Sequence, residues 1–260
     1  MSSISIITIC FNNLADLQKT FASIDGQTRL PEEHWVINGS TTPDIEQWLL
    51  NTPQPAYRKG INEKDKGIAD AFNKGIERAN FGITHLLHAG DRYASNDVLE
   101  TVVKFFEENP SVQWISGNIQ LIRAGKPVVV GKPFDKRKLY RGMRSISHPT
   151  WFVKKEVYDR IGLFSSEYKI AMDYDLMCRL ANEPYTYLNK VIAVFDDTGV
   201  SSNNYLRSLE ESKKVYESYF GFSFLLMIWQ FRLKLLHYLL QTGFGKWLFV
   251  LKKKLGFENW

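Results

Sequence analysis

Short apolar runs alternate with segments of helical periodicity through the first half of this chain. Ile4–Cys10 is a mostly apolar run of the length that buried parallel strands have. Similar runs follow, each separated from the next by a helix-like or polar segment: His34–Ile37, Ala56–Lys59 and Thr84–Leu87. This alternation predicts an α/β fold with a mostly parallel central sheet flanked by helices, a Rossmann-like arrangement.

Polar residues directly follow several of the predicted strands. Asn12 comes after the first strand, Asn38 after the second, and Asp91 after the fourth. In open parallel sheets, ligands bind at the carboxyl ends of the strands. We therefore expect these side chains to converge on one crevice, which is the first indication of a functional site.

The second half of the chain predicts further strands of the sheet. Gln113–Ile122 and Lys126–Val130 have the pattern of a hairpin around Ala124-Gly125, and Tyr185–Phe195 has the pattern of a late strand. We expect one domain over residues 1–202, with a first half at 1–110 and a second half at 111–202. A helical extension is expected over residues 203–260.

Composition is ordinary for a globular chain, with 44% hydrophobic residues. Cys10 and Cys178 lie far apart in apolar surroundings and outside any Cys-x-x-Cys pair, so we expect two buried thiols in a reducing compartment rather than a disulfide or zinc site. The first residues lack the pattern of a signal peptide, which favours a cytoplasmic location.

Asp91 is the leading candidate for a metal ligand. A carboxylate at a strand end, preceded by Gly90 so that a diphosphate can approach, suits Mn²⁺ or Mg²⁺. These cations need few protein ligands because diphosphate oxygens supply others. The alternative role for Asp91 is to cap the helix that starts near Ser95.

Asp173 and Asp175 form a second acidic site at the start of a predicted helix. Residues two apart on a helix face different directions, so one carboxylate can point into the crevice while the other caps or forms an ion pair. Asp173 is placed to accept a proton from an incoming hydroxyl, and its alternative role is an N-cap. His148 is a weaker candidate, since such a histidine is as often structural.

Taken in order, these segments resemble family 2 glycosyltransferases, which have the GT-A fold. The resemblance covers about residues 4–202 and implies that residues 1–202 are the catalytic domain, with a nucleotide-binding half at 1–110 and an acceptor-binding half at 111–202. Its most specific part is Asp65–Gly75, similar to the donor-binding D-x-G-x-x-D-A-x-N-x-G stretch of the family, which could otherwise be a polar loop and a solvated helix face. Further matches are the first strand and turn, the end of the first helix, the loop after the second strand and the segment of the catalytic base: Ile7–Asn12, Ser23–Gln27, Val36–Thr41 and Met172–Leu176.

The resemblance implies an inverting transfer from a UDP- or GDP-linked sugar to a glycan or polyprenyl-linked acceptor in surface-polysaccharide synthesis. Asp173 would be the base, needing no unusual pKa, and Asp91 would hold Mn²⁺ or Mg²⁺. His148 and Asp175 would contact acceptor or phosphate. The donor-binding residues would be Thr8, Phe11, Asn12, Asn38, Ser40, Asp65, Gly67, Asp70, Asn73, Lys74 and Gly90.

Two departures from the family pattern bear on this implication. Asn38 stands where the family usually has a nucleotide-contacting aspartate, and only Asp91 remains of the acidic metal motif. A catalytically weak nucleotide-binding pseudoenzyme of the same fold is therefore the alternative. A dinucleotide-binding enzyme is disfavoured because no G-x-G-x-x-G follows the first strand, and no P-loop is present.

The C-terminal segment is aromatic and basic. No acidic residue lies between Ser218 and Phe257. The same stretch contains six basic residues: Arg232, Lys234, Lys246 and Lys252-Lys253-Lys254. Residues 220–257 are expected to form in-plane amphipathic helices on the inner face of the cell membrane, because the longest uncharged run is too short to span a bilayer. The alternatives are packing on the catalytic domain or a homodimer interface. No nucleic-acid partner is expected, since no binding motif accompanies the basic residues.

Overall fold

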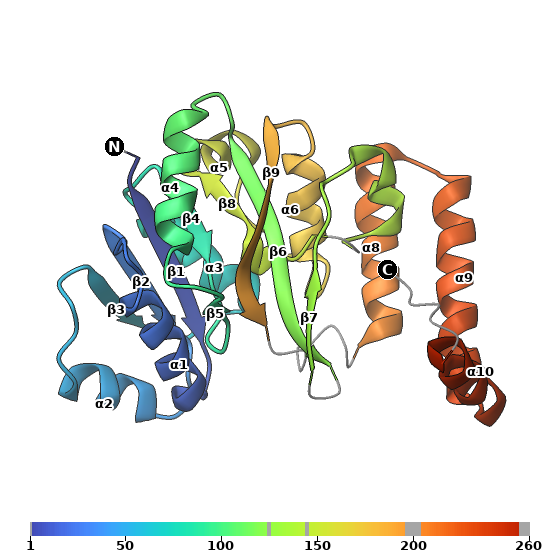
Figure 1. Ribbon diagram of the computed structural model, residues 1–260, viewed down its shortest axis with the longest axis horizontal. Coiled ribbons are helices and arrows are strands. Elements are labelled where there is room, and N and C mark those ends of the chain that lie inside the picture. Colours follow the sequence, from blue (N-terminus) through green and yellow to red (C-terminus); the bar gives the residue numbers. More distant parts are fainter. Residues whose placement is uncertain (1, 124–125, 144–145, 196–203, 255–260) are drawn as a thin grey trace.

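The computed structural model describes residues 2–123, 126–143, 146–195 and 204–254. The first four strands lie in parallel in the order β3-β2-β1-β4, and they are β1 (Ile4–Cys10), β2 (Glu33–Asn38), β3 (Arg58–Asn62) and β4 (Ile83–Leu86). Every residue of β1 is buried, because helices cover both faces of this part of the sheet (Figure 1). The predicted parallel strands are confirmed.

The other half of the sheet is mixed. It continues from β4 through β8 (Phe152–Lys154), β6 (Trp114–Arg123) and β9 (Tyr185–Phe195) to β5 (Arg92–Tyr93), and β7 (Lys126–Val130) pairs with β6. β8 is antiparallel to both β4 and β6, whereas β9 is parallel to β6. The predicted parallel pairing therefore holds for β1 to β4 and for β6 with β9, whereas the pairs made by β8, β7 and β5 are antiparallel.

Two layers of helices cover the sheet. The layer in front in Figure 1 contains α1 (Leu14–Asp25), α2 (Asp44–Asn51) and α4 (Val98–Glu108). The opposite face carries α3 (Ile68–Arg78), α5 (Lys155–Ile161), α6 (Met172–Leu180) and the short 3₁₀ helices η1 (Lys136–Arg141) and η2 (His148–Thr150). The largest apolar cluster lies on that second face and includes the fully buried Phe72 and Trp114. The candidate catalytic residues lie at its edge.

Three helices follow the sheet: α8 (Tyr205–Phe220), α9 (Phe224–Gln241) and α10 (Gly243–Lys254). α8 packs on α6, and its Val215 is fully buried in the main core. α9 and α10 lie farther from the sheet, beyond α8 (Figure 1). α8, which follows the predicted boundary at residue 202, therefore packs against the part of the chain that forms the sheet. Within the described ranges, no helix combines the length and the apolar character needed to cross a membrane.

Candidate active site

The loops that follow β1 and β2 are joined through Asn12. Its Oδ1 accepts hydrogen bonds from the N–H groups of Thr41 (3.0 Å) and Thr42 (3.2 Å), and its own N–H donates to Ser40 Oγ (2.9 Å). Asn12 has φ = 52°, a left-handed conformation that asparagine tolerates better than most residues. The two loops form one polar rim at the carboxyl ends of the strands, beside the exposed ring of Phe11.

Asn38 and Asp65 are packed into the floor of this rim. The Asn38 amide donates to Asn62 Oδ1 (2.9 Å) and accepts from the N–H of Ser40 (3.1 Å). Asp65 lies directly over Gly39: a Cβ at Gly39 would be 1.8 Å from Asp65 Oδ2. A side chain at position 39 would therefore force the Asp65 carboxylate to move.

Asp65 and the first turn of α3 form a compact charged turn. Asp65 Oδ1 accepts from the N–H of Gly67 (3.0 Å), and Asp70 Oδ2 accepts from that of Lys66 (2.9 Å), which lowers the pKa of Asp70. Lys74 Nζ lies 3.2 Å from Asp70. The predicted donor-binding stretch thus places Asp65, Gly67, Asp70 and Lys74 in one group next to the loop after β2.

Two residues predicted to bind the donor have other contacts. Asn73 uses both ends of its amide on the backbone of Phe164: Nδ2 donates to the carbonyl and Oδ1 accepts from the N–H, each at 2.9 Å. Thr8 is fully buried within β1, and its Oγ1 lies 2.9 Å from His34 Nε2. The structure does not bring these two side chains to the rim.

The loop after β4 carries Gly90 and Asp91. Gly90 has φ = 111°, a conformation that favours glycine, and its N–H donates to Thr20 Oγ1 (2.9 Å). The Thr20 hydroxyl in turn donates to the Asp91 carbonyl (2.8 Å), so α1 holds the backbone of this loop. Asn13 Nδ2 also donates to the Ala89 carbonyl (3.3 Å), which connects the loop to the one after β1. Asp91 itself is buried.

Asp173 lies in the first turn of α6 and does not cap it, because the N-cap is Ala171. Its side chain is 26% exposed, but Oδ1 is buried and accepts no hydrogen bond from any residue that the structure describes. Burial raises the pKa of Asp173 to about 6, against the electrostatic effect of His88, which lowers it. Asp173 is therefore still mostly ionised at pH 7, with a pKa closer to neutral than that of an ordinary aspartate.

Two imidazoles accompany Asp173. His148 Nδ1 lies 3.9 Å from Asp173 Oδ2, and burial lowers the pKa of His148 to about 3. Burial also lowers the pKa of His88 to about 4. The ring of Phe72 contacts both histidines, with centroid distances of 4.8 Å to His88 and 5.2 Å to His148. Both imidazoles are neutral at pH 7, so neither neutralises the carboxylate.

His88 was not assigned a role from the sequence, although it stands in the same His88–Asp91 segment as the metal candidate. His85, another unassigned residue, connects this region to the turn of His148. Its Nε2 donates to the carbonyl of Pro149 (3.0 Å), so Nδ1 is the acceptor for the Tyr93 hydroxyl (2.8 Å). His85 and Phe72 thus link the Asp91 loop to the Asp173 environment.

Asp175 lies outside this site. Its carboxylate is buried, with Oδ2 2.6 Å from Arg179 Nη2 and Oδ1 accepting from the Tyr219 hydroxyl (2.8 Å). Both oxygens are therefore occupied within the protein, which does not fit the predicted contact with acceptor or phosphate. Of the two carboxylates, Asp175 is the one in an ion pair, and Asp173 lies beside His148.

No group of three or more histidine, cysteine or acidic residues that could hold a metal ion occurs in the part of the chain that the structure describes. Both cysteines are buried and free. A divalent cation at Asp91 would therefore need most of its ligands from a bound diphosphate and water, as the sequence argument supposed.

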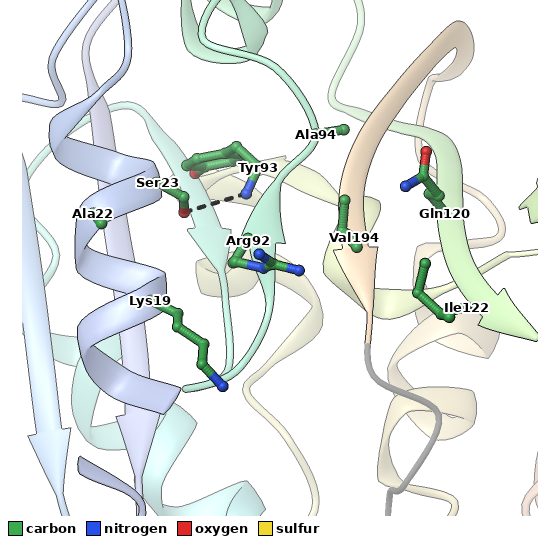
Figure 2. A pocket seen from close by; sticks show the side chains of 9 residues that line it. All are labelled: Lys19, Ala22, Ser23, Arg92, Tyr93, Ala94, Gln120, Ile122 and Val194. Carbon is green, nitrogen blue, oxygen red and sulfur yellow. Dashed lines mark hydrogen bonds between the residues drawn. The ribbon is translucent and has the colours of Figure 1, made fainter. Parts of the chain in front are cut away.

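An open groove of about 590 Å³ lies between α1, β5, β6 and β9 (Figure 2). Lys19, Arg92 and Gln120 give it a polar lining, and Ile122 and Val194 contribute apolar surface. None of the predicted donor-binding residues lines this groove. It lies on the α1 face of the sheet, opposite the face that carries α6 and Asp173.

Comparison with known families decides the class of protein. Residues 5–162 match Glycosyl transferase family 2. The chain belongs to this family. An uncharacterized glycosyltransferase of Mycobacterium tuberculosis is 32% identical over 209 residues, which cover 77% of this chain and 78% of the relative. A PGL/p-HBAD biosynthesis glycosyltransferase of Mycobacterium bovis is 27% identical over 205 residues, with 76% and 78% covered.

The fold of this family 2 glycosyltransferase resembles that of Staphylococcus aureus TarS. The TarS 1–349 structure gives a TM-score of 0.62 at 16% identity, covering 84% of this chain and 66% of TarS 1–349. The chain spans 40% of a longer TarS chain. TarS 1–349 has also been solved with UDP and with UDP-GlcNAc, at TM-scores of 0.59 and 0.56. The likeness confirms the predicted GT-A fold.

Proposed function

We propose that this protein is an inverting glycosyltransferase that uses a nucleoside-diphosphate sugar. The observation that carries the proposal is the environment of Asp173, whose buried Oδ1 accepts no hydrogen bond from the described residues and whose pKa is raised to about 6. A general base is most effective when its pKa lies near the working pH. A structural carboxylate in the same position would be expected to find a partner, as Asp175 does.

In the proposed reaction, an acceptor hydroxyl attacks the anomeric carbon of the donor from the side opposite the diphosphate. The hydroxyl proton passes to the Asp173 carboxylate, the new glycosidic C–O bond forms, and the bond between carbon and diphosphate oxygen breaks. The nucleoside diphosphate leaves with the bonding electron pair. His88 and His148, neutral and packed on Phe72, exclude water from one side of the carboxylate.

The proposed donor site is the rim formed by the loops after β1 and β2 together with the turn at Asp65. Phe11, exposed at the rim, offers a ring for stacking on a base, and Ser40 and Asn12 order the loops around it. UDP is the first nucleotide to test, since TarS 1–349 binds UDP and UDP-GlcNAc. GDP is the second.

Asp91 is proposed to hold Mn²⁺ or Mg²⁺ together with the donor diphosphate. When bound, the cation would offset the negative charge that develops on the departing diphosphate. What the chain itself supplies is a buried carboxylate on a loop anchored by Thr20, after a glycine at φ = 111°.

The acceptor is proposed to be a glycan or lipid-linked sugar in the synthesis of a surface polysaccharide or glycolipid. The PGL/p-HBAD biosynthesis relative supports an acceptor of this class. α9 and α10 support a membrane surface as the place of reaction, because they expose many large apolar side chains, among them Phe224 (66% exposed), Phe231 (69%) and Trp247 (58%). With no acidic residue from 218 to 257, this surface suits the inner face of an anionic membrane.

The test is a thermal-shift panel of UDP, GDP, CDP and dTDP, each with Mn²⁺, Mg²⁺ or EDTA. At 100 times its Kd, a ligand of the folded state should raise the Tm by about 5–10 °C for a protein of this size. We expect one nucleotide to give a shift with metal that EDTA abolishes and that Asp91→Ala loses. No shift with any nucleotide at millimolar concentration would contradict the proposed donor site.

A further inference from the structure

The helix α8 makes two polar contacts with the start of α6, one on each side of Asp173 in the sequence. Glu211 Oε2 accepts hydrogen bonds from the N–H groups of Ile170 (2.7 Å) and Ala171 (3.1 Å), immediately before the helix. The Tyr219 hydroxyl donates to Asp175 Oδ1 (2.8 Å) in the first turn. The three hydrogen bonds join residues that are 41, 40 and 44 positions apart in the sequence.

Glu211 is built into this position. It is buried, and its Oε1 accepts from Arg207 Nε at 3.1 Å, one turn earlier on α8. The two backbone N–H groups and the arginine lower the pKa of Glu211 despite its burial, so the carboxylate stays charged at neutral pH. A carboxylate at the N-terminus of α6 is also favoured by the helix dipole.

Asp173 needs such external support. No side chain caps α6, because its N-cap is Ala171. Asp173 Oδ1 accepts no hydrogen bond from the described residues, and His148 is 3.9 Å from Oδ2, beyond hydrogen-bond distance. The direction of the carboxylate is therefore set by the backbone of the first turn, which Glu211 and Tyr219 hold in place.

We infer that α8 positions the catalytic base, with Glu211 as the principal positioning residue and Tyr219 as the second. This inference rests on the proposed role of Asp173. Neither residue touches the reacting atoms. Each acts on the backbone or side chain next to Asp173, so its loss should lower the rate of transfer more than the binding of the donor.

The experiment uses the full chain with Glu211→Ala, the conservative Glu211→Gln, and Glu210→Ala as the matched control. Glu210 is the exposed neighbour on the same helix. Hydrogen–deuterium exchange is followed in the peptides that contain Ile170 and Ala171. We expect faster exchange in Glu211→Ala, nearly normal exchange in Glu211→Gln, whose amide oxygen still accepts, and no change in Glu210→Ala.

Turnover is measured in parallel as UDP release from UDP-GlcNAc and UDP-glucose by hydrolysis, in which water replaces the acceptor hydroxyl and receives the sugar. A displacement of the base should lower kcat by about tenfold to a hundredfold in Glu211→Ala, with KM for the donor changed less than about threefold. Glu211→Gln should recover most of kcat. Unchanged exchange together with a kcat within twofold of wild type in Glu211→Ala would overturn the inference.

Tyr219→Phe keeps the inference testable if Glu211→Ala does not fold, because it removes only a hydroxyl from a partly exposed side chain. It should lower kcat about threefold and leave KM unchanged, and unaltered kcat and exchange would again overturn the positioning role. If wild type releases no UDP, the proposed function fails for these donors, whereas the exchange data still decide whether α8 holds the start of α6.

Discussion

α8 and α9 are neighbouring helices of similar length, but they differ in how much of their apolar surface is buried. α8 places Val215 and Leu209 in the interior and directs Glu211 and Tyr219 at α6. α9 buries only Leu226, Gln230 and Leu233 among its described residues and exposes apolar side chains along most of its length. One C-terminal segment therefore contains both a helix that packs into the main core and a helix that leaves most of its apolar side chains exposed.

The largest expected difference between the two helices is their response to a substitution that introduces a charge. Val215→Asp places a carboxylate in the main core and should destabilise the fold by more than about 3 kcal/mol. Phe231→Asp, on the exposed face of α9, should change stability by less than about 0.5 kcal/mol. Urea unfolding of both variants checks the contrast, and equal destabilisation would show that α9 packs as α8 does.

Removing exposed aromatic side chains should affect membrane binding rather than folding. Phe224→Ser combined with Phe231→Ser should weaken flotation with vesicles of phosphatidylglycerol and phosphatidylcholine by at least about tenfold, since each phenylalanine contributes on the order of 1–2 kcal/mol when buried. Leu209→Ser, at a buried position of α8, is the control with the opposite expectation: it should affect folding rather than membrane binding. A concentration-dependent dimer that dissociates in the double variant, without vesicle binding in wild type, would favour the homodimer.

The pH dependence of UDP release should be set by Asp173 and should not change when the exposed face of α9 is altered. With a pKa raised to about 6 by burial, Asp173 is a competent base above pH 6 and is protonated below it. UDP release should therefore fall about tenfold per pH unit below 6, with the same midpoint in the Phe224→Ser/Phe231→Ser variant. A profile that stays flat down to pH 5 in wild type would contradict Asp173 as the base.

Salt should have the smallest effect, confined to α9 and α10. Raising the salt concentration from 0.1 M to 0.5 M should weaken binding to anionic vesicles about threefold to tenfold, because charge attraction is screened while apolar insertion is not. Thermal unfolding in the same buffers should change little. Salt-independent vesicle binding would mean that the basic residues of the segment do not contribute.

The sequence was sufficient for features whose cause is local. Ile4–Cys10 forms β1, Lys126–Val130 forms β7 and Tyr185–Phe195 forms β9, all at their predicted bounds. The division between Asp173 and Asp175 also follows from helical spacing. These features depend on periodicity and on neighbouring residues, which a single sequence displays directly.

Features set by distant contacts were not predictable. β5 has only two residues and exists because it pairs with β9, about a hundred positions later. Asn73 fits a donor-binding motif, but its amide holds Phe164, 91 residues away. The raised pKa of Asp173 and the Glu211 contact likewise arise from packing between separate helices. No local pattern indicates which of several polar residues will be used inside the protein.

The most direct test of the account is a comparison of Asp173→Asn with wild type in donor binding, UDP release and unfolding. A raised carboxyl pKa means that the folded state disfavours the charge, a cost present above pH 6 and relieved as the pH falls toward 4. Asn removes that cost, so the variant should be more stable at pH 7.5 by up to about 3 kcal/mol. We expect it to keep the thermal shift with nucleotide and metal and to lose transfer at least a hundredfold. Near-normal turnover in Asp173→Asn would contradict the central claim.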